Sequence, residues 1–193
     1  MIPPPVSLAG LVLRVLLWLP LCYALWYPAA PVLLLPAVLM SQGALHALLP
    51  GIVDHMQIGA DGLRIFTTLS SAPGGHYGFT LDARSYGYGM ALLAALVLAT
   101  PAPRRWADLL LGLGLLQPFI AWGLVFAVLR ALLAGHAEQL LPDPGARRLW
   151  TEGVQLGARL GLLAFAPLAP VLIWAGLQHR TLSRILSGGS PAT

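Results

Sequence analysis

The chain has 193 residues, of which 58% are hydrophobic and only 9% are charged. A soluble domain carries about 25% charged residues, so the composition excludes an ordinary soluble protein and predicts one domain, residues 1–193, that is solvated by lipid. All 11 basic residues are arginines, and with so few charges the net charge of +4 bears on membrane orientation and not on nucleic-acid binding.

Four apolar stretches approach the length of about 20 residues that a helix needs to cross a bilayer. They cover residues 7–28, 85–100, 106–133 and 153–177, and the second is short. The sequence therefore predicts an all-α integral membrane protein with about four transmembrane helices.

A further apolar run, residues 31–49, has two compatible placements. Its Ser41, Gln42 and His46 recur at near-helical spacing, which gives the run a polar side and favours a helix along the outer membrane surface. A crossing of the membrane would instead move the N-terminus to the other side and leave everything downstream unchanged. The prolines of "YPAAP", residues 27–31, are expected to end the first helix before this run.

Residues 53–83 interrupt the helical pattern. The stretch alternates loosely, contains Ile, Phe and Thr, and includes the turn clusters "GADG" and "APGGHYG", which together predict a small two-stranded β-hairpin. Lipid cannot satisfy the backbone groups at an open sheet edge, so the hairpin is expected outside the membrane. Two strands alone are marginally stable in water, so another part of the chain or another protein must cover them.

The positions of the arginines predict the orientation. Arg104 and Arg105 separate the second and third spans, and Arg180 and Arg184 follow the fourth, so both regions are expected in the cytoplasm. The hairpin and the loop at 134–152 would then face the periplasm. Arg147 and Arg148 in that loop count against the rule, although acidic residues accompany them.

The fourth span carries a glycine ridge. Gly153, Gly157 and Gly161 lie four residues apart and line one helical face, where another backbone can approach closely. Packing against the second or third span of the same chain is favoured, and a contact with a partner is the alternative. Glu152, Gln155 and Arg159 form a polar stripe beside it. Arg159 is a candidate functional residue because it lies within a span, but its shallow depth also allows it to snorkel or to pair with Glu138 or Glu152.

Catalytic patterns are weak. Cys22 lies within a span without a basic neighbour, and no histidine pair has the spacing of metal ligands, so we expect neither a cofactor nor a bound metal. A membrane enzyme would have to build its outer-face site from four residues: His55, His76, Asp54 and Arg84.

Several segments, in order, resemble the exosortase H-associated membrane proteins. These are "LLWLPLCYALWY", the hairpin leading into "DARSYGYGMALLAALVLA", then "PAPRRW", "LLQPFIAWG" and "LAPVLIWAGLQHR". The resemblance implies an accessory protein of the inner membrane of Gram-negative bacteria, associated with an exosortase that processes proteins bearing a C-terminal sorting tail. Exosortases are similar to membrane cysteine transpeptidases that use Cys, Arg and His at the outer face. This chain lacks a matching motif, so no catalytic residue is carried over.

Two hypotheses follow. The favoured one is a non-enzymatic scaffold whose hairpin and glycine ridge contact the exosortase or its tailed substrates. The alternative is a membrane enzyme with the outer-face site named above.

Overall fold

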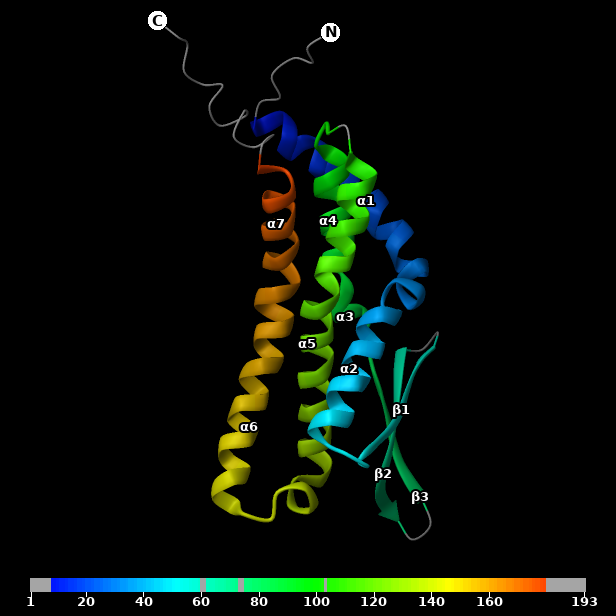
Figure 1. Ribbon diagram of the computed structural model, residues 1–193, viewed down its shortest axis with the longest axis vertical. Helices are drawn as coiled ribbons and strands as arrows, with labels where there is room; N and C mark the ends of the chain where they lie inside the picture. The colour runs from blue at the N-terminus through cyan, green and yellow to red at the C-terminus, as the bar shows by residue number, and fades with distance from the viewer. Residues whose placement is uncertain (1–7, 60–61, 73–74, 103, 180–193) are drawn as a thin grey trace, which may run out of the picture. The chain divides into compact units, whose positions relative to one another are not determined.

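The computed structural model describes residues 8–59, 62–72, 75–102 and 104–179 (Figure 1). The elements are mostly helical, as the composition predicted. In chain order they are α1 (Leu8–Leu33), α2 (Leu35–Leu48), β1 (Val53–Gly59), β2 (Gly62–Ala72), β3 (Gly75–Leu81), α3 (Arg84–Gly87), α4 (Gly89–Ala99), α5 (Arg105–Leu140), α6 (Pro144–Arg159), the π-helix η1 (Leu160–Phe165) and α7 (Ala166–Leu177).

Three helices of the described chain are long and apolar enough to cross a membrane. They cover Ala9–Leu33, Arg105–Leu140 and Pro144–Leu177. The predicted span at 85–100 forms a shorter helical stretch, Arg84–Ala99. Its 16 residues would extend about 24 Å at about 1.5 Å per residue, which is less than the hydrocarbon thickness of about 30 Å. A fourth crossing at this position stays a prediction.

The first helix does not end at "YPAAP", which corrects the expectation from its prolines. α1 continues to Leu33, and hydrogen bonds run across the junction with α2: the Leu34 amide donates to Ala30 O (2.9 Å) and the Val38 amide to Leu34 O (3.0 Å). Each proline removes one amide donor but leaves its neighbours able to pair. In an apolar chain, leaving the helix would cost more unpaired backbone groups than staying in it.

The loop expected at 134–152 is largely helical, a second correction. α5 continues to Leu140 and α6 begins at Pro144. The carboxylate of Asp143 accepts the amides of Gly145 (3.3 Å) and Ala146 (3.0 Å), so it caps the start of α6. Pro144, at the first helical position, adds to this signal for a helix start. Residues 141–143 lie outside a helix, and α5 is kinked at His136, whose backbone is not helical (φ −139°, ψ 31°).

The chain divides into two compact units, which we describe separately. The helical unit contains residues 1–28, 88–116 and 167–193, and the sheet unit contains 29–87 and 117–166. In the helical unit, the Trp174 indole donates to the Thr100 hydroxyl (3.1 Å), which donates to Leu96 O (2.8 Å). This chain of bonds connects α7 to the end of α4. Eight of the eleven residues of α4 are buried.

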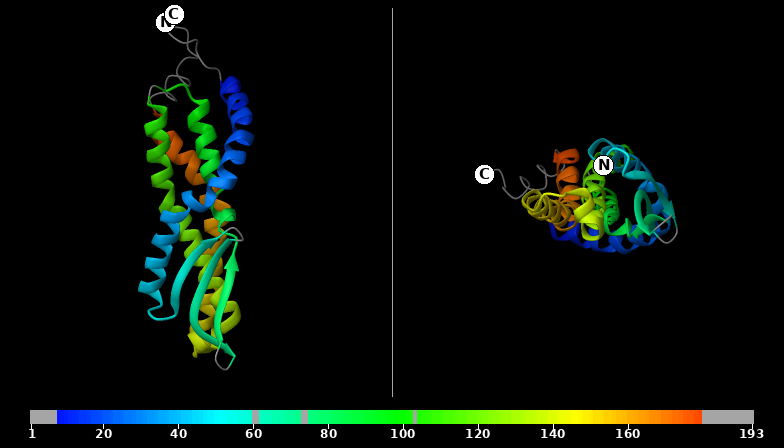
Figure 2. Two further views of the ribbon diagram at one scale, coloured as in Figure 1. Left: turned by 90° about the vertical axis from the view of Figure 1, so that its right-hand side faces the viewer. Right: turned by 90° about the horizontal axis from the view of Figure 1, so that it is seen from below.

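The sheet unit contains one antiparallel sheet with the strand order β1-β2-β3 (Figure 2). The sheet has three strands rather than two, because β1 and β2 are separate antiparallel strands whose ends, Gly59 and Gly62, pair with each other. Leu63, Ile65 and Thr67 of β2 are buried, while Arg64 and Thr68 are exposed. α2 packs against β1 (Figures 1 and 2), so another part of the same chain lies against the sheet.

Candidate functional site

The first candidate site lies at the start of β1. The Nδ1 atom of His55 is 2.9 Å from Oδ2 of Asp54, and the Nε2 atom of His46 on α2 lies 3.2 Å from the backbone oxygen of Asp54. The His55 ring stacks on Phe66 of β2 at a centroid distance of 4.3 Å. Two of the four proposed enzyme residues, Asp54 and His55, are therefore in contact, and both are exposed.

The strand register separates the other two from this pair. His55 pairs with Phe66, whereas the backbone of His76 pairs with Ser70, four residues farther along β2. At about 3.3 Å per residue the two histidines lie about 13 Å apart along the sheet. The side chain of His76 lies outside the described part of the structure.

Arg84 lies toward the opposite end of β2. Leu81 at the end of β3 pairs with Leu63, three residues before Phe66, and Arg84 follows three residues beyond Leu81. The backbone amide of Arg84 donates to Oδ1 of Asp82 (3.1 Å). His76 and Arg84 therefore flank the Asp54–His55 pair on opposite sides. Among the described residues, no three His, Cys, Asp or Glu side chains gather as a metal site.

The polar stripe of α6 is exposed. Arg148 pairs with Glu152 (3.0 Å), and Arg147 pairs with Glu138 (3.5 Å), so the two acids considered as partners for Arg159 have other partners. Arg159 itself is exposed and makes no hydrogen bond or ion pair within the described residues. Gln155 is exposed on the same face.

The three ridge glycines differ in what they face. A Cβ on Gly157 would overlap the ring of Phe126 on α5, and a Cβ on Gly161 would lie 2.7 Å from the Cα of Gly123. Both glycines therefore allow α5 to approach closely. By contrast, no described atom of a neighbouring element lies within 4 Å of a Cβ built on Gly153.

Sequence reasoning did not identify the residues that oppose this ridge. The Trp122 indole donates to Gly157 O (3.4 Å) and its ring contacts Phe126 at a centroid distance of 4.7 Å. A Cβ on Gly123 would lie 2.6 Å from the Tyr86 ring of α3. The sequence feature that could have revealed this contact is Trp-Gly-Leu-Val-Phe at 122–126, where a glycine lies between two aromatic residues and leaves room for a neighbouring element.

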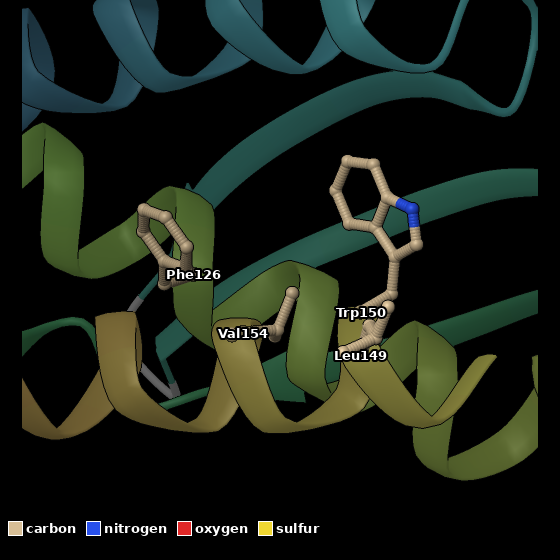
Figure 3. Close-up of a pocket in the computed structure, with 5 residues that line it drawn as sticks. Phe126, Leu149, Trp150 and Val154 are labelled. Atoms are coloured by element: carbon tan, nitrogen blue, oxygen red, sulfur yellow. The ribbon is translucent and has the colours of Figure 1, made fainter. Parts of the chain in front are cut away.

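An apolar pocket opens beside Gly153 (Figure 3). Its volume is about 380 Å³, and its walls are Phe126 of α5 and Leu149, Trp150, Gly153 and Val154 of α6. A second cavity of about 130 Å³ shares Trp150 and Val154 with this pocket. Its other walls are seven leucines, from the end of α2 and from α5 and its C-terminal end: Leu48, Leu49, Leu129, Leu132, Leu133, Leu140 and Leu141.

Comparison with known protein families gives one match. A family model described as exosortase H-associated membrane protein matches residues 5–181. No curated protein and no solved structure matches the chain. The resemblance seen in the sequence is thereby confirmed over most of the chain.

Proposed function

Since this chain belongs to the family of exosortase H-associated membrane proteins, we propose that it is a non-enzymatic accessory or scaffold protein of the bacterial inner membrane. In this role it acts with an exosortase in the sorting of proteins that bear a C-terminal tail. Its partners are the lipid bilayer and the exosortase or the tailed substrates.

The observation that carries the non-enzymatic assignment is the strand register. Acid–base or nucleophilic chemistry needs side chains within about 3 Å of one another or of a shared reacting atom. The residues proposed for such a site lie at three separate positions along the strands, near the backbone pairs His55–Phe66, His76–Ser70 and Leu81–Leu63. The sequence neighbours Asp54 and His55 are in contact.

The exposed face of the sheet is the proposed contact surface. It presents Arg64 and Thr68 with the half-buried Phe66 between them, and His55 stacks on the Phe66 ring. Gly157 and Gly161 are already occupied by α5, so the part of the hypothesis that assigned the glycine ridge to a partner is withdrawn for these two. An amphipathic surface of this kind, with an aromatic centre and a polar rim, is typical of protein contacts.

The proposed topology is multi-pass, with the sheet in the periplasm and the C-terminus in the cytoplasm. It is supported by Arg104, which directly precedes α5, and by Arg105, which begins it, because arginines in short connections favour the cytoplasmic side. α2 has 14 residues, fewer than the roughly 20 that a membrane crossing needs, which favours its placement outside the membrane.

The enzyme alternative rests on the Asp54–His55 contact, and a complementation experiment separates the two functions. In cells that lack this protein, a variant with alanine at positions 54, 55, 76 and 84 is expressed, and processing of a tailed substrate is measured. The scaffold function predicts that processing falls far less than about a hundredfold, since His55 only supports Phe66 on the contact surface and none of the four side chains performs chemistry. Loss of processing by at least about a hundredfold, the size of a general acid–base contribution, with normal protein levels would instead establish the enzyme.

A further inference from the structure

The pocket at α5–α6 has walls that suit a hydrocarbon. Leu149 is 73% exposed and Trp150 is 55% exposed, although both are large and apolar. The volume of about 380 Å³ lies within the range of about 300–1,000 Å³ found for ligand pockets. The adjoining leucine-lined cavity of about 130 Å³ is close in size to cavities that bind benzene or xenon.

Two polar groups that make no hydrogen bond with the described residues lie on the two helices that form this pocket. The indole N–H of Trp150 has no acceptor among the described residues. Arg130 is exposed, makes no hydrogen bond or ion pair within the described chain, and lies four residues after Phe126 on α5. That spacing places Arg130 on the same helical face as Phe126, one turn farther on. Helical side chains lean toward the N-terminus, which is the direction of Phe126 from Arg130. The charge of Arg130 also interacts with Tyr86 of α3.

The depth of Arg130 matches the membrane surface. Residues 109–129 of α5, 21 in number, contain no charged side chain and lie between Asp108 and Arg130. At about 1.5 Å per residue they extend about 31 Å, which is the thickness of the hydrocarbon region. With this stretch across the bilayer, Arg130 lies at the level of the lipid headgroups.

We propose that this pocket binds an anionic phospholipid, which goes beyond the proposed scaffold function. One acyl chain lies against Phe126, Gly153 and Val154, and the headgroup phosphate accepts hydrogen bonds from Arg130 and the Trp150 indole. A protein segment fits less well, because its backbone amides need partners and the lining supplies only one side-chain donor, the Trp150 indole. An acyl chain needs none.

The test uses the full chain in detergent with equimolar dioleoylphosphatidylglycerol and dioleoylphosphatidylcholine, and native mass spectrometry counts the bound lipids. Gly153→Leu fills the pocket without a clash, since space is open at its Cβ. The matched control is Gly176→Leu on α7, where the space at the Cβ is also open. Displacing two methylene groups already weakens binding about tenfold. We therefore expect Gly153→Leu to lower the affinity for lipid at least about tenfold, whereas Gly176→Leu should keep the wild-type affinity.

A second variant tests the headgroup. Arg130→Gln should keep the chain-binding pocket but lose the preference for phosphatidylglycerol over phosphatidylcholine. Wild-type lipid retention by Gly153→Leu would overturn the pocket assignment. An undiminished preference for the anionic lipid in Arg130→Gln would overturn the headgroup assignment.

Discussion

Single glycines of α6 and η1 have different roles although their spacing is identical. The Phe126 ring occupies the position of a side chain on Gly157, whereas space is open at Gly153. Gly157→Leu should therefore lower the free energy of unfolding by about 1–3 kcal/mol, the usual cost of overpacking, while Gly153→Leu stays near the wild type. Thermal unfolding in detergent measures both. Equal melting temperatures for the two variants would show that α5 does not pack on this ridge.

The sequence predicted a shared helical face for the three glycines but not which of them is filled. That outcome depends on the residue opposite, and Phe126 lies on another helix 31 residues earlier in the chain. Arg159 is a similar case. The sequence suggested Glu138 or Glu152 as its partner, but Arg147 pairs with Glu138, and Arg148, at the i,i+4 spacing, pairs with Glu152.

At the scale of the strand, burial now distinguishes the two faces of β2. Ile65 is buried and Phe66 is half-buried against His55. Ile65→Asp should lower the amount of folded protein, since it places a charge without a partner in the interior. Phe66→Asp forfeits an aromatic contact of about 0.5–1.5 kcal/mol, so it should fold but capture less exosortase H.

The amount of folded protein in membranes and the co-purified exosortase H are the two readouts. Gln139→Asp is the matched control for an added charge, because Gln139 is exposed and lies on another element, near the end of α5. If Phe66→Asp captures as much exosortase H as Gln139→Asp, the sheet face is not the contact surface.

The elements themselves were predictable where the signal is local. The turn clusters gave the strands of residues 53–83, and long apolar runs gave the helices. Two local signals misled: the prolines at 28 and 31 do not end α1, and most charged residues at 138–152 lie in helices, with Asp143 in the turn between them. Around the prolines the helix continues because its other backbone amides pair within it, and near 138–152 side-chain polarity did not distinguish a loop from two helix ends. The π-helix at 160–165 had no sequence signal that we recognised.

At the scale of the whole molecule, every proposed contact with an exosortase depends on which side of the membrane the sheet unit faces. Composition and arginine placement predicted a membrane protein with its sheet outside. The candidate enzyme residues were only partly predictable, because their mutual distances follow from strand register, which depends on the bulge between Val53 and His55.

Cysteine labelling in intact cells tests this orientation most directly. In a chain whose own cysteine is removed by Cys22→Ala, single cysteines are placed at Gln57, exposed on β1, and at Ala102, between α4 and α5. A membrane-impermeant maleimide should label position 57 from the periplasm and should reach position 102 only after the inner membrane is permeabilised. Labelling of position 102 and protection of position 57 in intact cells would contradict the proposed topology and, with it, the sheet face as the surface that meets the exosortase.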